Sequence, residues 1–367
     1  VHTHYDAQLT WDSNATPSPS LGVTTVVVGN CGFSIAPCPP ECRDLIARNL
    51  AEVEGMSLTA LRSGTNWDFE TFDEYLTLLK RKGVTPNVAA FIGHSAVRTM
   101  VMGPEASERA AREDEVLEMR DLVSGGMDAG AVGLSTGLDY IAQCFSTTDE
   151  LVEVAAAMSA QRGLYVTHVR YKKGTLEGIR EAVAIGERAR VPVHISHMKG
   201  TTPEEIDTIL DYVDRSARQE VDFSFDVYPY LPGSTMLNFL LPFEVWEAGP
   251  ISAMSRLTDP HVRRQFDREL ENTKLDQSHI AWLPGKENSR HIGKTLAAYI
   301  DEVGGAGSPA DVLCDLLIEE HLAVLLVFHH GDDALVHPFL AHDCYMMGTD
   351  GIYFPDSVVH PRMYGSA

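Results

Sequence analysis

Two histidines stand one residue apart at the start of the chain, in the β-prone run "VHTHYDAQLTWD". Residues two apart on a strand point to the same face, so His2 and His4 can hold one metal ion together. Such a pair is weak evidence by itself, because strand histidines can also simply alternate out of the core. The pair becomes informative only if other ligands converge on the same place.

Four further candidate ligands follow other apolar, β-branched runs. Cys31 comes after "VVVGN", His168 ends "VTH", His197 ends "ISH" and Asp350 follows "MMGT". Each alone has an ordinary structural explanation, such as a buried thiol or a turn aspartate. Together they are the imidazole, thiolate and carboxylate groups that zinc prefers. The whole set exceeds the needs of one catalytic zinc, and it suits either two adjacent ions or one ion plus a catalytic base.

The elements that must position these residues alternate between strands and helices. Helices are expected, for example, at 70–82, 105–124, 148–162, 175–190 and 203–219. Strands are expected at 23–28, 88–93, 131–135, 164–168, 193–197, 221–227 and 344–349. This alternation predicts parallel strands with right-handed crossovers, and the His2–His4 segment brings the count to eight. We therefore expect an α/β fold, a (β/α)8 TIM-like barrel, with every candidate ligand on its C-terminal rim.

One interval breaks the alternation. More than a hundred residues separate the strand ending near 227 from the strand starting near 344, and they include "YPYLPGST", the strand-like "HIAWLP" and the apolar run 322–328. We interpret residues 235–330 as an insertion, a lid over the barrel mouth. The domain prediction is one barrel over 1–367 that contains this insertion.

Composition limits the class of partner. The chain has 367 residues, of which 44% are hydrophobic, and its 52 acidic and 29 basic residues give a formal charge of −23. This charge argues against nucleic-acid or anionic-membrane partners. No 18-residue apolar run or signal-peptide pattern is evident, and six cysteines in this length do not suggest a disulfide scaffold. We expect a cytoplasmic protein that acts on a small molecule; the sequence leaves its oligomeric state open.

The chain resembles the amidohydrolase superfamily and, within it, the N-acyl-D-amino-acid deacylases (D-aminoacylases). The resemblance rests on stretches in family order along the chain: "HTHYDAQ", "GVTTVVVGNCGFS", "GHSAVR", "GAVGLSTGLDY", "THVR", "VPVHISHMKG", "YPYLPGST", "VFHHGDD", "MMGTDG" and "HPRMYGSA". It implies a zinc-dependent hydrolase that cleaves N-acyl-D-amino acids to a carboxylate and a D-amino acid by way of metal-bound hydroxide.

The resemblance also implies roles for individual residues. Most two-metal amidohydrolases bridge their ions with a carbamylated lysine, whereas the D-aminoacylase branch is similar to this chain in carrying a cysteine after the second strand. One tightly held Zn²⁺ would then be bound by Cys31, His168 and His197. A second, weaker site would use His2, His4 and Asp350 with the shared Cys31, and Asp350 would also move the catalytic proton. The substrate carboxylate would be bound by Lys199, Tyr228, Ser234 and Arg362, a set of charges and hydroxyls that suits it.

Two alternatives stay open at this point. One is a hydantoinase-like or other cyclic-amide amidohydrolase, against which the missing bridging lysine argues. The other is a truncated, catalytically silent zinc-binding barrel. Family members carry residues before the H-x-H strand and a long tail that together build a small β-sandwich, and we expect that sandwich to be absent here. The complete ligand set argues against a silent barrel.

Overall fold

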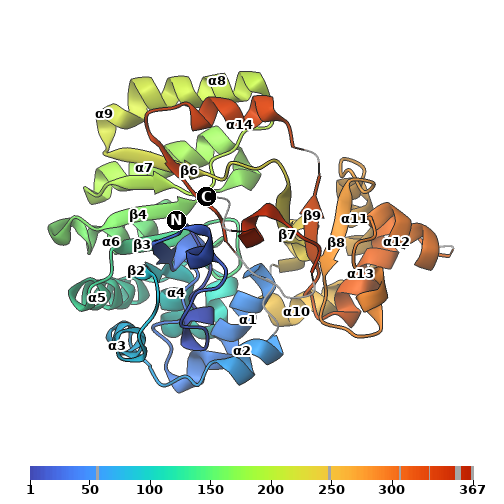
Figure 1. Ribbon diagram of the computed structural model, residues 1–367, viewed down its shortest axis with the longest axis horizontal. Helices are drawn as coiled ribbons and strands as arrows, with labels where there is room; N and C mark the ends of the chain where they lie inside the picture. The colour runs from blue at the N-terminus through green and yellow to red at the C-terminus, as the bar shows by residue number, and fades with distance from the viewer. Residues whose placement is uncertain (55–57, 247–248, 306, 330, 352–356, 365–367) are drawn as a thin grey trace.

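Seven parallel strands form the main sheet of the protein, in the order β1-β2-β3-β4-β5-β6-β10 (Figure 1). The computed structural model describes residues 1–54, 58–246, 249–305, 307–329, 331–351 and 357–364, so the end of the last family-like stretch, 365–367, lies outside it. The strands are β1 Thr25–Val28, β2 Asn87–Gly93, β3 Gly133–Gly137, β4 Leu164–His168, β5 Val193–Ile195, β6 Phe223–Val227 and β10 Tyr345–Met347. Each overlaps a predicted strand, and the α/β class with parallel pairing is confirmed.

Helices follow the strands and lie along the outer side of the curled sheet (Figure 1). They are α1 Arg43–Glu54, α2 Leu58–Gly64, α3 Phe72–Lys82, α4 His94–Met102, α5 Glu113–Ala129, α6 Thr148–Ala156, α7 Thr175–Ala189, α8 Pro203–Tyr212, α9 Arg218–Glu220 and α14 Asp333–Leu340. The helix predicted at 105–124 begins only at Glu113, because Gly103–Ser107 forms a separate 3-10 turn. The helix predicted at 203–219 is interrupted by a π-helical turn at Val213–Ala217.

The predicted first strand appears as two isolated bridges instead of a full strand. His2 pairs with Val27 of β1, and Thr3 pairs with Gly351 beyond β10, both in the parallel sense. The Thr3 amide donates to the Val27 carbonyl at 3.0 Å, and the His4 amide donates to the Gly351 carbonyl at 3.0 Å. The N-terminal segment therefore joins the two outer strands of the sheet at the end where the candidate ligands lie.

The long interval before β10 contains a second, antiparallel sheet with strand order β7-β9-β8. Its strands are β7 Gly233–Met236, β8 Ser278–Trp282 and β9 Leu325–Phe328, and its helices are α10 Gly249–Arg256, α11 Pro260–Leu270, α12 Leu296–Val303 and α13 Pro309–Glu319. This region has an apolar core of its own that includes Phe266, Ile280, Leu313 and Leu326. The structure thus contains the strand expected near 279–284, and the apolar run 322–328 contains β9.

A buried carboxylate near the start of α5 predicts acid-dependent stability. Both Glu115 oxygens accept hydrogen bonds from the Arg109 guanidinium, at 2.7 and 2.8 Å, and one also accepts the Arg112 amide at 2.7 Å. Hydrogen bonding by Arg109 outweighs the opposing effect of burial and lowers the pKa of Glu115 from 4.5 to about 2. The stability that this group contributes is therefore complete above pH 4.5 and is lost as the pH falls toward 2.

We expect Glu115→Gln to lower the free energy of unfolding at pH 7, and the deficit relative to the parent should shrink between pH 4.5 and pH 2. Denaturant titrations at several pH values measure this. Glu118→Gln, on an exposed position of the same helix, is the matched control and should show no such convergence. A Glu115→Gln deficit that stays constant across this range would contradict the assignment.

Candidate metal centre

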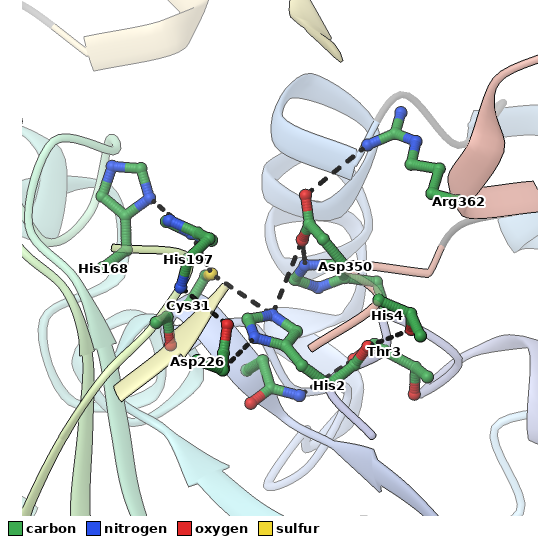
Figure 2. Close-up of polar contacts among 12 residues, drawn as sticks. His2, Thr3, His4, Cys31, His168, His197, Asp226, Asp350 and Arg362 are labelled. Carbon is green, nitrogen blue, oxygen red and sulfur yellow. Dashed lines mark hydrogen bonds and ion pairs between the residues drawn. The ribbon is translucent and has the colours of Figure 1, made fainter. Parts of the chain in front are cut away.

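The structure brings all six predicted ligands together at the C-terminal rim of the parallel sheet (Figure 2). Their donor atoms form two groups, each with all members within 4.8 Å of one another: His2, His4 and Cys31, and Cys31, His168 and His197. Cys31 belongs to both groups. Asp350 Oδ1 lies 3.1 Å from His4 Nε2 and 3.6 Å from His2 Nε2, so this carboxylate adjoins the first group.

Three of these side chains are carried by left-handed backbone. The φ angles are 51° at Cys31, 39° at His197 and 48° at Asp350, and each residue lies in the turn that follows its strand. This conformation costs a residue with a side chain roughly 1 kcal/mol or more, and such residues cluster at functional sites. The rim turns therefore accept an unfavourable backbone conformation at positions that direct side chains toward one point.

Buried Gln143 holds the turn that carries Cys31. Its side-chain amide donates to the Cys31 carbonyl at 3.1 Å and accepts the Gly137 amide at 2.7 Å. A Cβ at Gly137 would lie 2.2 Å from the Cys31 carbonyl oxygen, so only glycine permits this approach. The glycine of the "STGLDY" stretch is thus explained by close backbone packing beside the ligand cysteine.

Two carboxylates that sequence reasoning missed orient the histidines. Asp139, two residues beyond β3, has Oδ2 3.3 Å from His168 Nε2. Asp226, near the end of β6, has Oδ2 3.0 Å from His2 Nδ1, and its Oδ1 accepts the His197 amide at 2.7 Å. Carboxylates of this kind typically fix the orientation of metal-binding imidazoles. The rule that selected Asp350, an acid at the end of a strand, would have selected both.

The electrostatics of the rim favour the deprotonated forms of its thiol and its carboxyl. Burial alone would raise the pKa of the Cys31 thiol, but the charge of His197 and hydrogen bonds from the surrounding histidines hold it well below its usual value. Burial opposes charge on Asp350 as well, yet hydrogen bonding and charge from His4 keep the pKa of that carboxyl well below its usual range. The site therefore offers a thiolate and a carboxylate, the forms that bind metal.

The spacing of the second group fits a zinc ion. His168 Nδ1 lies 3.1 Å from His197 Nε2, and Cys31 Sγ lies 3.4 Å from the same His197 nitrogen. Zinc–nitrogen and zinc–sulfur bonds of about 2.0–2.3 Å in tetrahedral arrangement separate ligand atoms by roughly 3.3–3.8 Å. The Cys31–His197 separation lies in this range and the His168–His197 separation is slightly shorter, so the two imidazoles and the thiolate are close enough to form a zinc-binding donor set.

Three of the four predicted substrate residues line a cavity of about 530 Å³ beside the centre, and the fourth, Arg362, contacts one of them. Lys199, Tyr228 and Ser234 line this cavity together with His168, His197 and Asp350. Arg362 Nη2 donates to Ser234 Oγ at 2.8 Å, and its Nη1 lies 3.9 Å from Asp350 Oδ2. Lys199 Nζ lies 4.3 Å from the centre of the Tyr171 ring. Arg362 and Ser234 thus form a contacting pair, whereas Lys199 reaches the cavity from the turn after β5.

The insertion contributes to the same cavity. Phe239, Lys274 and Phe328, all from the region of the antiparallel sheet, are among its lining residues.

No helix in the described part of the chain is long and apolar enough to cross a membrane.

The fold and the site define an α/β protein with a cysteine- and histidine-rich centre at the rim of a parallel sheet. The chain matches the amidohydrolase family, Amidohydro_3, over residues 1–231, and it belongs to this family.

Several named proteins are similar to this chain in sequence and in fold. D-aminoacylase of Alcaligenes xylosoxydans xylosoxydans is 38% identical over 249 residues, which are 65% of this chain and 47% of the relative. A solved D-aminoacylase with a binuclear metal centre has a TM-score of 0.73 and 29% identity, over 99% of this chain and 66% of that one. N-acyl-D-glutamate deacylase of Bordetella bronchiseptica, solved with zinc and a phosphonate inhibitor, has a TM-score of 0.73 and 26% identity, over 100% and 66%. The match to the curated D-aminoacylase thus spans about half of that enzyme's length.

Proposed function

We propose that the chain carries the active site of a zinc-dependent hydrolase that cleaves the amide bond of N-acyl-D-amino acids. The observation that supports this most is the convergence of two donor groups on the shared Cys31, with all donor atoms of each group within 4.8 Å of one another. The names of the relatives supply the substrate class: one is a D-aminoacylase, and another is an N-acyl-D-glutamate deacylase that binds zinc.

We assign the tight zinc to Cys31, His168 and His197, and a second, weaker position to His2, His4 and Asp350 with Cys31 shared. D-aminoacylase is described as having one-metal activation and second-metal attenuation, which supports an active form with one ion. When bound, zinc supplies a Lewis acid for the acyl carbonyl and lowers the pKa of a water.

Asp350 is proposed to move the proton. It is held as a carboxylate beside His4 and borders the cavity, so it can accept the proton that the attacking water loses. The water oxygen then forms its bond to the acyl carbon, the carbon–nitrogen bond breaks, and the same proton passes from Asp350 to the leaving amine. The products are a carboxylic acid and a D-amino acid.

The substrate carboxylate is proposed to bind Arg362 and Ser234, with Lys199 and Tyr228 completing its surroundings. Arg362 is 6% exposed, and a guanidinium already fixed by Ser234 is well suited to a carboxylate. Pinning this carboxylate presents the acyl carbonyl to the centre in one orientation. Inverting the α-carbon would direct the side chain into the cavity wall, which accounts for a preference for the D form. Since insertion residues line the cavity, we propose that 235–330 covers it as a lid.

Arg362→Ala should raise KM for the free acid roughly 10- to 100-fold, because a charge-assisted contact is worth about 1.5–3 kcal/mol. Esterifying the substrate carboxylate should do the same to the parent. Steady-state kinetics on D and L substrates, free and esterified, measure both effects. Arg264→Ala, at an exposed position of α11, is the control. Equal rates on ester and acid would contradict the carboxylate site, and equal rates on D and L forms would contradict the stereochemical argument.

The proposed function is tested by zinc content and turnover of the whole chain. We expect about one tightly bound zinc, hydrolysis of N-acyl-D-amino acids, loss of both on chelation and recovery of both on adding zinc. Hydrolysis of a cyclic amide such as a hydantoin, without hydrolysis of linear substrates, would overturn the substrate class. Zinc binding without turnover of any amide would overturn the catalytic assignment.

A further inference from the structure

Asp226 contacts two ligand residues of the centre, His2 and His197, whereas an acid that orients one ligand histidine needs to contact only that histidine. It is 5% exposed and lies one residue before the end of β6. Its Oδ2 faces two ring nitrogens at 3.0 Å each, His2 Nδ1 and His194 Nε2, and its Oδ1 accepts the backbone amide of His197 at 2.7 Å. Figure 2 shows the carboxylate between His2 and His197. One side chain is thus bonded to a residue of each donor group.

The contact with His2 determines which of its ring nitrogens can bind metal. An ionised carboxylate only accepts hydrogen bonds, so the nitrogen facing Asp226 must carry a proton. His2 therefore keeps its proton on Nδ1 and directs Nε2 toward the centre, where it lies 3.8 Å from Cys31 Sγ and 3.6 Å from Asp350 Oδ1. Without a pure acceptor at this place, His2 could adopt the other tautomer, in which Nε2 is protonated and cannot bind.

The contact with His197 acts through the backbone. His197 has a left-handed conformation, and two consecutive amides of its turn are bound by the same aspartate: the His197 amide by Oδ1, and the Met198 amide by the Asp226 carbonyl at 2.8 Å. The Tyr171 hydroxyl lies 3.0 Å from the Ser196 carbonyl oxygen and 3.2 Å from that of His197. These hydrogen bonds stabilise an unfavourable φ angle, and that angle directs the His197 ring at Cys31.

We propose that Asp226 is a positioning residue for both donor groups, acting on His2 through its ring and on His197 through its backbone. Asp139 differs, because its contact with the centre is made through His168 alone among these ligands. The proposal rests on the proposed metal centre. According to this proposal, both donor groups depend on one carboxylate, which lies 224 residues from His2 in the sequence.

Zinc affinity of the whole chain, measured by competition with a chromophoric chelator, tests this. Asp226→Asn has the same shape but presents an NH₂ donor to His2 or His194, so we expect both zinc equivalents to bind roughly 10- to 100-fold more weakly. Asp139→Asn should weaken only the equivalent that uses His168. Ser224→Ala is the matched control, since Ser224 Oγ is 2.8 Å from His194 Nδ1, one step further along the same chain of hydrogen bonds, and it should change neither.

Two further measurements distinguish a positioning role of Asp226 from a purely structural role. Thermal unfolding of the metal-free variants reports stability, and a structural role would lower it while leaving affinity at 25 °C unchanged. In the zinc-loaded parent, ¹⁵N NMR of the imidazoles should show His2 protonated at Nδ1, an observation that needs no variant. Parent-like affinity for either equivalent in Asp226→Asn, or His2 bound through Nδ1, would overturn the proposal. If the parent itself bound no zinc, the metal centre would fail with it.

Discussion

Replacing Cys31 with alanine is expected to remove tight zinc and hydrolytic activity together. Cys31 is the member that both donor groups share, and it is the buried thiolate among their imidazoles. Its loss leaves the tight position with two histidines, His168 and His197, which are too few for a tight structural or catalytic zinc. The loss in affinity should exceed the roughly 10- to 100-fold that removal of a mere orienting partner costs.

Zinc content after dialysis and turnover of an N-acyl-D-amino acid measure this outcome. Cys344→Ala is the control, because Cys344 immediately precedes β10 and belongs to neither donor group. Full zinc retention with normal turnover in the Cys31 variant would remove this residue from the site, while loss of zinc with normal turnover would separate the metal from the chemistry.

Asp350→Asn is expected to retain the tight zinc and to lower kcat by roughly 10²- to 10⁴-fold, the typical contribution of a positioned acid–base group. The group of Cys31, His168 and His197 is complete without Asp350, so its affinity should change little. Asparagine keeps the size of the side chain and an oxygen that can face His4, but its amide cannot take up the proton of water.

The kcat and the zinc content of this variant are compared with those of Asp343→Asn, at an exposed position just before β10. A near-normal kcat in Asp350→Asn would mean that another group handles the proton. Loss of the tight zinc would mean that the position formed by Cys31, His168 and His197 also requires Asp350, contrary to the division proposed above.

The strands could be predicted because short apolar, β-branched runs are a local property of the sequence. The rim ligands could be predicted because parallel strands place their carboxyl ends on one edge, so a residue's place after a strand is enough. The start of α5 was harder to predict from the sequence, because it depends on a separate 3-10 turn and on the contacts of Glu115 with Arg109 and Arg112.

The orienting carboxylates depend on contacts between distant segments. Asp226 bonds to His2 across 224 residues, and Asp139 bonds to His168 across 29 residues. Their place at strand ends puts both acids on the rim, but only these contacts reveal which histidines they orient. The strand β7 is similar, because "GSTM" has little β-pattern of its own and pairs with β9 through residues nearly a hundred positions away. Pairing energy, which local propensity does not contain, decides such elements.

The isolated bridges at His2 and Thr3 would couple occupancy of the proposed weaker metal position to closure of the sheet. The segment that presents His2 and His4 is also the one that joins β1 to β10, so an ion that binds these imidazoles binds only the docked segment. By mass action, each tenfold rise in free ion above the dissociation constant then adds about 1.4 kcal/mol to docking. Undocking would leave two parallel strands with free edges, which are templates for pairing with other chains. Supply of an ion to the weaker position would therefore protect these edges as well as fill the centre.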